Sequence, residues 1–239
     1  MMVFRFYKNQ NIMQPLKIGH RGAKGYVAEN TLESINKALA LKVDGIEIDV
    51  HKCKSGELVV FHDFTLDRIT NGVDEVSKFT LQELKSLKVD GQYQIPTLQE
   101  VLKTINRSCF LNIELKGKNT AAKTVDIIEY YVLNENWEYS DFIVSSFQHQ
   151  ELKEVYSLNN KIPLAVLTKA NLEEAITFAK TINTKILHPN FALLSESNVK
   201  RAQSNGYIIN TWTVNTPKAI ARMKKYKVNA IISDYPDRV

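Results

Sequence analysis

Short apolar runs alternate with longer amphipathic stretches along most of the 239-residue chain. Short runs with few polar interruptions are typical of buried strands, and the wider apolar spacing between them is typical of helices that bury one side. Eight runs are predicted to be strands, at residues 16–20, 45–50, 111–115, 142–147, 164–167, 185–188, 207–214 and 230–233. Strands that alternate with helices in this way indicate repeated βα units.

Several of the predicted helices begin at a residue that can cap the first turn. A Thr or Asn side chain at this place accepts a hydrogen bond from a free backbone N–H, and an acid three positions later lies in the first turn. Proline directly after the cap fits the first helical position. These signals predict helix starts at Asn30 with Glu33, Thr97 with Glu100, Asn171 with Glu174, and Thr216 with Pro217.

The number and order of these elements predict an α/β fold, the TIM (β/α)8 barrel. An open, doubly wound parallel sheet is the alternative, because periodicity does not reveal whether the edge strands meet. No low-complexity segment or Gly- and Pro-rich linker divides the chain. We therefore expect residues 1–239 to form a single domain.

One connection is much longer than the others. A further apolar run at 58–61 follows the turn-forming tripeptide Lys54-Ser55-Gly56, which predicts a hairpin that continues from the second strand. A long connection inside a compact domain usually carries function. We predict an insertion over about residues 51–94, between the second strand and the second helix. It is expected to lie over the C-terminal mouth of the barrel, where such enzymes place their chemistry.

Acidic side chains lie at the C-terminal ends of two predicted strands. Glu47 and Asp49 share one face of the second strand, and Glu114 and Lys116 share one face of the third, opposite the apolar residues. With the apolar faces toward the helices, the acids point into the barrel, where they repel one another unless a cation or a proton lies among them. We predict a divalent cation held by Glu47, Asp49 and Glu114, and oxygen ligands favour Mg²⁺ or Ca²⁺. The alternative is that internal bases, Lys116 and Arg21 among them, neutralise the acids.

Two histidines are placed to take part in proton transfer. His20 ends the first strand and precedes Arg21 and Gly22, a pair suited to a phosphate because arginine offers a fork and glycine lets backbone donors approach. His62 follows the extra apolar run, so both imidazoles are expected at one end of the fold, where they can act as acid and base. Trp212, near the end of the seventh strand, is a candidate wall for the carbon skeleton of a substrate. Structural roles for these side chains are the alternative.

Composition narrows the possible partners. The chain has 31 Lys and Arg against 26 Asp and Glu, a net charge of +5, and its one dense basic cluster, at 222–227, has helical spacing typical of a solvated face. We expect no nucleic-acid partner.

Two cysteines, Cys53 and Cys109, are too few for a disulfide framework, and their places at opposite ends of strands separate them too far for a bond. No apolar run is long enough to span a bilayer and no secretory core follows the start, so we expect a cytoplasmic protein without stable membrane association.

Short motifs follow one another in a fixed order over nearly the whole chain. They are Gly19-His20-Arg21-Gly22, Glu29-Asn30-Thr31, Gly45-Ile46-Glu47-Ile48-Asp49-Val50, Val59-Val60-Phe61-His62-Asp63, Leu66-Asp67-Arg68 with Thr70-Asn71-Gly72, Ile95-Pro96-Thr97-Leu98, Asn112-Ile113-Glu114-Leu115-Lys116, Ser145-Ser146-Phe147, Trp212-Thr213-Val214-Asn215 and Ser233-Asp234-Tyr235-Pro236. Each is unspecific by itself, but the ordered set is specific. Through it, the chain resembles the glycerophosphodiester phosphodiesterase family.

The resemblance implies a TIM barrel with a small insertion after the second strand, and hydrolysis of glycerophosphodiesters to glycerol 3-phosphate and an alcohol with the help of a divalent cation. It implies catalytic roles for His20 and His62, metal binding by Glu47, Asp49 and Glu114, and phosphate contacts from Arg21 and Lys116. The chain departs from the family in the turn at residues 52–55 and in its first twelve residues, which match nothing. The second departure motivates the hypothesis that Met13 is the true start.

The two histidines and a neighbouring hydroxyl of the substrate suggest a two-step reaction. One imidazole would take the proton of the glycerol hydroxyl beside the phosphodiester, that oxygen would attack phosphorus, and the other imidazole would protonate the departing alcohol. Direct attack by water stays open. Two further alternatives are a phosphodiesterase or lyase that acts on phospholipids, which would need an apolar rim facing the membrane, and a catalytically silent barrel that binds phosphorylated ligands.

Overall fold

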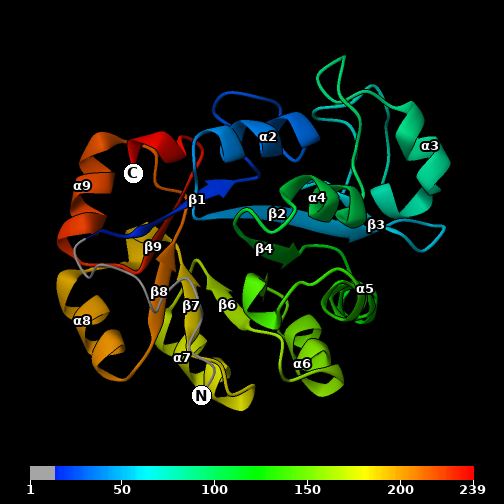
Figure 1. Cartoon of the computed structure of the whole chain (residues 1–239). Helices are drawn as coiled ribbons and strands as arrows, with labels where there is room; N and C mark the ends of the chain where they lie inside the picture. Colours follow the sequence, from blue (N-terminus) through cyan, green and yellow to red (C-terminus); the bar gives the residue numbers. More distant parts are fainter. Residues whose placement is uncertain (1–13) are drawn as a thin grey trace.

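The computed structural model describes residues 14–239. Within these residues, nine strands form one sheet, and eight of them run parallel in a ring that helices surround (Figure 1). The strands are β1 (Leu16–His20), β2 (Gly45–Lys52), β3 (Leu58–Val60), β4 (Phe110–Leu115), β5 (Phe142–Ser146), β6 (Leu164–Thr168), β7 (Ile186–Pro189), β8 (Ile208–Thr211) and β9 (Ala230–Ser233). β8 is shorter than the predicted run 207–214, because the backbone leaves the β-ladder after Thr211.

The ring is closed by the first strand. In the parallel register, Ile18 of β1 lies opposite Gly45 of β2 on one side and opposite Ile232 of β9 on the other. With the remaining strands in the order β9-β8-β7-β6-β5-β4-β2, the parallel strands of residues 14–239 form a closed ring with no open edge. The predicted TIM barrel is confirmed, and the open doubly wound alternative is wrong.

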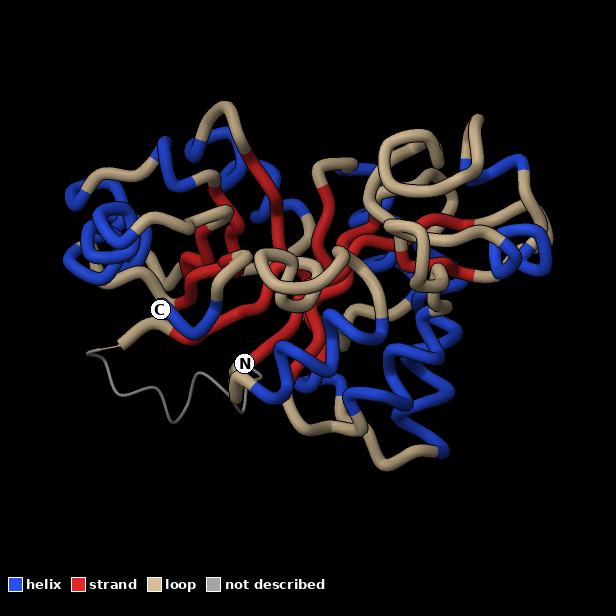
Figure 2. Tube along the Cα trace, turned by 90° about the horizontal axis from the view of Figure 1, so that it is seen from above, coloured by secondary structure: helices blue, strands red, loops and turns tan. Residues whose placement is uncertain are grey.

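Helices connect successive barrel strands on the outside (Figures 1 and 2). They are α2 (Leu32–Ala40), α4 (Leu98–Ile105), α5 (Ala121–Asn134), α6 (His149–Leu158), α7 (Leu172–Thr181), α8 (Glu196–Ser204) and α9 (Pro217–Lys225), and a short 3₁₀ turn, η4 (Pro236–Arg238), follows β9. Other 3₁₀ turns are η2 (Tyr139–Asp141) and η3 (Phe191–Leu193).

Three of the four predicted helix starts are confirmed. Thr97, Asn171 and Thr216 each accept a hydrogen bond from the first turn of their helices. The prediction at Asn30 is wrong, since the cap of α2 is Thr31, whose side chain accepts from Ser34 N–H. Asn30 has a left-handed backbone, with φ of 58°, and its side chain is used elsewhere.

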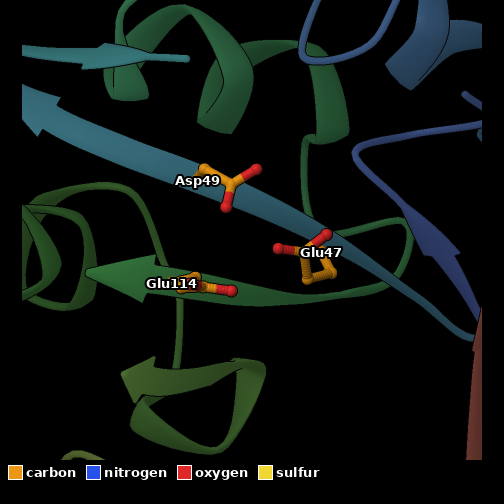
Figure 3. A group of neighbouring side chains, drawn as sticks. All are labelled: Glu47, Asp49 and Glu114. Carbon is orange, nitrogen blue, oxygen red and sulfur yellow. The ribbon is translucent and has the colours of Figure 1, made fainter. Parts of the chain in front are cut away.

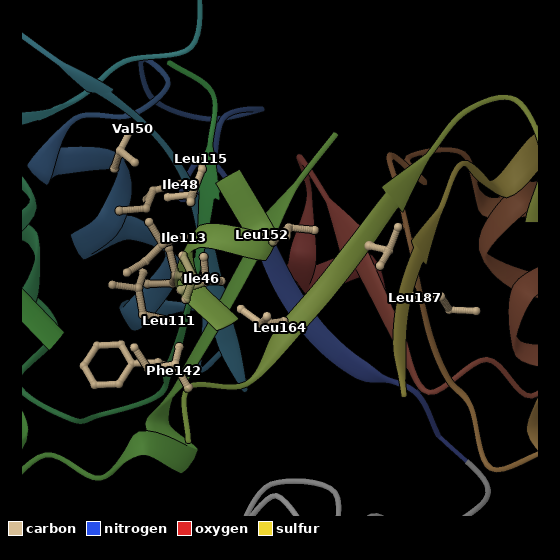
Figure 4. Close-up of a cluster of buried hydrophobic side chains, with 14 of the residues drawn as sticks. Ile46, Ile48, Val50, Leu111, Ile113, Leu115, Phe142, Leu152, Leu164 and Leu187 are labelled. Atoms are coloured by element: carbon tan, nitrogen blue, oxygen red, sulfur yellow. The ribbon is translucent and has the colours of Figure 1, made fainter. Parts of the chain in front are cut away.

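Two separate apolar layers follow from the alternation of side chains along the strands. Outward-facing residues of β2 and β4, such as Ile46 and Ile113, are fully buried against the helices (Figure 4). A smaller set fills the barrel interior below its mouth, which we call the lower cluster: Ile18, Phe110, Ile143, Ala165, Ile186, Ala230 and Ile232. The even spacing of these inward residues leaves the following inward positions, nearer the C-terminal strand ends, for polar side chains.

The long connection after β2 forms a compact extension at one side of the barrel (Figure 1). β3 pairs antiparallel with the end of β2, with Lys52 opposite Leu58, and Gly56 in the turn between them has φ of 101°. The chain then forms η1 (Val76–Lys78) and α3 (Leu81–Ser86) before it enters α4. This segment has its own small core, built around residues such as Leu66 and Leu84. Its hairpin carries His62 from the end of β3 toward the barrel.

Other expectations concern isolated features. Cys53 and Cys109 are both buried and unpaired. Among residues 14–239, no helix combines the length and the apolar character needed to cross a bilayer. Met13, the hypothetical start, lies outside the described residues.

Candidate active site

Three buried carboxylates meet between the middle of β2 and the C-terminal end of β4. These strands are neighbours in parallel register, which sets Asp49 opposite Glu114 and Glu47 opposite Asn112. Each acid offers an oxygen, and these oxygens all lie within 4.8 Å of one another. The side chains point toward a common space (Figure 3). The predicted convergence of Glu47, Asp49 and Glu114 is therefore present in the structure.

The turn after β1 brings Arg21 to this group through its backbone as well as its side chain. Arg21 has φ of 50° and Gly22 has φ of 85°, and a Cβ at Gly22 would lie 2.5 Å from Ser34 Oγ, so the tight turn requires glycine. In this conformation Arg21 N–H donates to Glu47 Oε2 at 2.9 Å, and Arg21 Nε lies 3.3 Å from Asp49 Oδ2. The turn thus places one hydrogen-bond donor, the Arg21 N–H, and one positive charge, its guanidinium, at the carboxylates.

The side chains around the carboxylates form a connected network of ion pairs that is not neutral. Lys116 Nζ lies 3.2 Å from Glu114 Oε1 and 3.9 Å from Asp49 Oδ1. The acids of the network are Glu29, Glu47, Asp49, Asp63, Glu114 and Asp234. Its Lys and Arg members are Arg21, Lys24, Arg68 and Lys116. With all six acids ionised and both histidines neutral, the internal bases would leave a formal excess of two negative charges, which a divalent cation would balance.

The pKa values of the acids respond to this excess. Burial raises the pKa of Glu47 well above its ordinary value, and the charges of Asp49 and Glu114 raise it further. Burial, together with the charge of Asp49, raises the pKa of Glu114 to about 7. Carboxyl groups whose pKa is raised by burial and mutual repulsion are stabilised in their ionised form by a bound cation. Carboxylate oxygens are the ligands that Mg²⁺ and Ca²⁺ prefer. The donor set fits such an ion.

His20 is held at the edge of the carboxylate group by a residue from the last strand end. Its Nδ1 lies 2.5 Å from Asp234 Oδ1, and its Nε2 lies 3.9 Å from Glu47 Oε2. Asn215 Nδ2 donates to the other oxygen of Asp234 at 2.7 Å, which fixes the carboxylate. Burial lowers the pKa of His20 although Asp234 opposes this shift. The result is an oriented, neutral imidazole whose Nε2 faces the site.

His62, in the extension, is held by a carboxylate in the same way as His20. Its Nδ1 lies 2.5 Å from Asp63 Oδ1, and Arg68 Nε donates to Asp63 Oδ2 at 2.5 Å. Arg68 Nη2 also donates to Glu29 Oε1 at 2.5 Å, so one guanidinium joins the extension to the loop after β1. Burial lowers the pKa of His62. Each of the two histidines is therefore oriented through Nδ1 by a carboxylate.

These groups surround one cavity at the mouth of the barrel, with a volume of about 80 Å³. Its lining includes all of the predicted site residues except Asp49: His20, Arg21, Glu47, His62, Glu114, Lys116 and Trp212. The Trp212 indole N–H donates to the His188 carbonyl oxygen at 2.7 Å, and its ring meets Phe147 edge-on at 5.5 Å. Trp212 lines the cavity with Phe147 beside it, and its contact with a substrate stays a prediction.

Several residues that organise the site were given no role in the sequence analysis. Asp234 and Arg68 lay in recognised motifs, and the place of Asp234 directly after a barrel strand was a usable signal. Asn30 was interpreted as a helix cap, but its Nδ2 donates to Asp49 Oδ2 at 2.9 Å. Glu29, which binds both Arg21 and Arg68, gave no periodic signal because it lies in a loop.

Comparison with known proteins places this geometry in a family. A family model described as "Glycerophosphoryl diester phosphodiesterase family" matches residues 20–238. A glycerophosphodiester phosphodiesterase of Caldanaerobacter subterraneus subsp. tengcongensis is 35% identical over 238 residues, which cover 94% of this chain and 96% of the relative. A glycerophosphodiester phosphodiesterase of Bacillus altitudinis is 36% identical over 235 residues, covering 92% and 94%.

A solved structure agrees with these relatives. The Oleispira antarctica phosphodiesterase in complex with the product sn-glycerol-3-phosphate superimposes with a TM-score of 0.85 at 29% identity, and the match covers 94% of each chain. The family model spans most of the sequence, and the two relatives align over nearly their whole length. The chain therefore belongs to the glycerophosphoryl diester phosphodiesterase family.

Proposed function

We propose that this protein hydrolyses glycerophosphodiesters to glycerol 3-phosphate and an alcohol, with a divalent cation and with His20 and His62 as acid and base. The single observation that carries the proposal is the pair of imidazoles, each oriented by a carboxylate, that line one cavity with two of the three clustered acids. The relatives named as glycerophosphodiester phosphodiesterases support the substrate class.

Glu47, Asp49 and Glu114 would hold the cation. When bound, a divalent cation supplies positive charge that stabilises the negative charge developing on the phosphoryl oxygens. The excess negative charge of the ion-pair network and the raised pKa values of Glu47 and Glu114 support this assignment. Mg²⁺ and Ca²⁺ are the candidates.

The two histidines are suited to move protons at their Nε2 atoms. Because Nδ1 of each imidazole is engaged by a carboxylate, Nε2 is left for the substrate. The lowered pKa values keep the free imidazoles neutral near pH 7, with the proton on Nδ1 toward the carboxylate, so Nε2 of one histidine can accept a proton. The histidine that acts as the acid donates from Nε2 in its doubly protonated form, whose charge the carboxylate on Nδ1 stabilises. In our proposal one histidine takes the proton of the glycerol hydroxyl beside the phosphodiester, and the other protonates the departing alcohol. The roles reverse when water opens the cyclic phosphate.

Three further residues would position the substrate. The Arg21 guanidinium and the Lys116 ammonium carry positive charge on the cavity wall and would contact the phosphoryl oxygens. Trp212 would pack against the carbon skeleton of the substrate.

A cytoplasmic location of the protein stays a prediction.

A panel of diesters tests the activity. We expect release of glycerol 3-phosphate from soluble glycerophosphodiesters that differ in their alcohol, loss of this activity with a chelator, and recovery with added Mg²⁺ or Ca²⁺. Activity on phospholipid vesicles but not on soluble diesters would favour the phospholipase-like alternative. No release from any diester in the presence of either metal would favour a barrel that only binds phosphorylated ligands.

A second experiment tests the internal attack. A diester whose glycerol lacks the hydroxyl beside the phosphodiester has no internal nucleophile. We expect this analogue to bind as a competitive inhibitor without turnover. Full turnover would show that water attacks phosphorus directly.

A further inference from the structure

Besides Arg21, whose Nε lies in an ion pair with Asp49, two buried polar side chains that line the cavity each have an atom without a hydrogen-bond partner. Within the described residues, neither Asn112 Oδ1 nor His188 Nδ1 has a partner, and the two residues are 1% and 0% exposed. Buried polar atoms are nearly always paired, so an unpaired set on a cavity wall indicates a ligand or water that completes it. The proposed proton transfer and metal binding use neither residue.

The protonation of His188 is fixed by its neighbour. Asn210 Nδ2 lies 3.0 Å from His188 Nε2 and donates to it, which leaves the proton of a neutral imidazole on Nδ1. Burial lowers the pKa of His188 to about 3, so the ring is neutral at working pH. His188 Nδ1–H is therefore a donor without a partner, and the Asn112 amide adds an acceptor and further donors.

The depth of these side chains follows from the strands. Asn112 lies two residues after Phe110 on β4, and His188 lies two residues after Ile186 on β7. Phe110 and Ile186 belong to the lower cluster, so the polar pair lies directly above the apolar filling of the barrel. Glu114, one of the proposed cation ligands, comes two residues later, whereas Glu47, another of them, lies opposite Asn112. We call Asn112 and His188 the floor pair.

We propose that the floor pair binds the terminal hydroxyl of the glycerol moiety, so that glycerol enters the barrel and the variable alcohol points outward. This proposal rests on the proposed function. A hydroxyl both donates and accepts, which matches an imidazole N–H together with an amide. The terminal hydroxyl is five bonds from phosphorus, and two strand residues rise about 6.6 Å, so a phosphate held near Glu114 lets the hydroxyl reach the floor. The cavity of about 80 Å³ has room for such a group, because a single water needs only roughly 10–15 Å³.

The test compares two substrates with the same alcohol. One diester contains glycerol, and the other contains propane-1,2-diol, which keeps the hydroxyl beside the phosphodiester and lacks the terminal one. For the unmodified protein we expect kcat/KM to be about 10- to 100-fold lower with the deoxy diester, because the floor pair is left buried and unpaired. In Asn112→Leu and His188→Leu the ratio of the two kcat/KM values should approach one.

Ser145→Ala is the matched control. Ser145 Oγ is also buried and unpartnered within residues 14–239, but Ser145 does not line the cavity, so this variant should keep the ratio of the unmodified protein. Because the unmodified protein alone already tests the ratio, a variant that fails to fold does not remove the test.

The outcomes separate this proposal from the proposed function. Inactivity of the unmodified protein on all diesters would contradict the function itself. Activity with equal kcat/KM on both diesters would overturn the proposed contact of the floor pair with the terminal hydroxyl and would leave the proposed function unaffected. A titration of Mg²⁺ or Ca²⁺ by calorimetry covers the remaining case: a large loss of metal affinity in Asn112→Leu, with the substrate ratio unchanged, would make Asn112 a metal ligand and overturn its proposed contact with the hydroxyl.

Discussion

The two ends of the barrel interior are built from the same strands and have opposite character. At the N-terminal end of β4 the inward side chain is Phe110, part of the lower cluster, and at the C-terminal end it is Glu114. The inward Ile232 of β9 is followed, two residues later and directly after the strand, by Asp234. The lower end is apolar and fully buried, whereas the upper end gathers like charges. One strand thus contributes to folding at one end and to chemistry at the other.

The comparison shows where this fold accepts an energetic cost. The lower cluster gains free energy from burying apolar surface, without polar atoms to satisfy. At the upper end, repulsion and burial hold the pKa of Glu114 at about 7, and buried polar atoms of Asn112 and His188 are unpaired in the described structure. Such conflicts with local rules are expected at functional sites. Four changes, in order of decreasing effect, test this division.

The largest effect is expected from Glu114→Ala at the upper end. Loss of one of three proposed ligands to the cation should lower kcat/KM by about 10³-fold or more. Stability without metal should stay the same or rise, because one of three repelling acids is gone. Steady-state kinetics and urea unfolding with a chelator measure the two quantities.

Glu135→Ala is the control for this change, since Glu135 is an exposed acid at the C-terminal end of α5. This substitution should change neither kcat/KM nor the stability without metal. Retention of more than a tenth of the activity in Glu114→Ala, with saturating metal, would contradict the assignment of this residue.

Ile143→Ala should have the opposite profile at the lower end. Ile143 is 2% exposed within the lower cluster, and its truncation leaves a cavity that costs about 2–5 kcal/mol of unfolding free energy. The kcat at a temperature where the variant is folded should stay within about twofold of the original value, since the site lies above. Ile143→Val, with an expected cost of about 0.5–1.5 kcal/mol, gives a graded control. A loss of kcat as large as that of Glu114→Ala would show that the two ends are not separable.

His188, at the boundary between the two ends, is expected to make the stability of the protein depend on pH. The pKa of His188 falls from 6.5 to about 3 through burial, so between these values the unfolded chain binds a proton that the folded chain does not. Stability contributed by neutral His188 is therefore present above pH 6.5 and lost as pH falls. Between about pH 7.5 and about pH 4.5 the loss should be about 2–3 kcal/mol.

Urea unfolding at several pH values measures this loss, and His188→Leu is the comparison. The variant should show a flatter dependence on pH over the same interval, whatever its stability at neutral pH. Identical slopes for the two proteins would mean that His188 is not held neutral.

The smallest effect is expected from Arg68→Met, which removes the bridge between Asp63 and Glu29. Without this contact the carboxylate that orients His62 is less constrained, and kcat/KM should fall about tenfold. The Arg68 side chain is 46% exposed, so stability should change by less than about 1 kcal/mol.

Lys78→Met provides the matched control in the same extension. It removes an exposed ion pair with Asp74 and should leave kcat/KM unchanged. Equal effects of the two substitutions would argue against a positioning role for Arg68.

Much of the site was predictable because strands impose a strict alternation. Glu47 and Asp49 had to share a face, and the apolar residues between them identified the outer side. The same logic failed in loops, where no period applies. Asn30 was predicted to cap a helix, and its contact with Asp49 depends on a left-handed backbone that the residue pattern does not reveal. Glu29 and Arg68 meet across 39 positions of sequence, a separation over which periodicity carries no information.

The sequence by itself determined which strands and helices form, that each strand has one apolar outer face, and which residue types reach the mouth, because side-chain spacing and turn chemistry act over a few residues. Only the tertiary structure decided that β1 closes the sheet against β9, that Asp234 orients His20, and that Asn112 Oδ1 and His188 Nδ1 are left unpaired in residues that line the cavity. These are meetings between distant segments, and they depend on the register and curvature of a closed barrel, which no local pattern specifies.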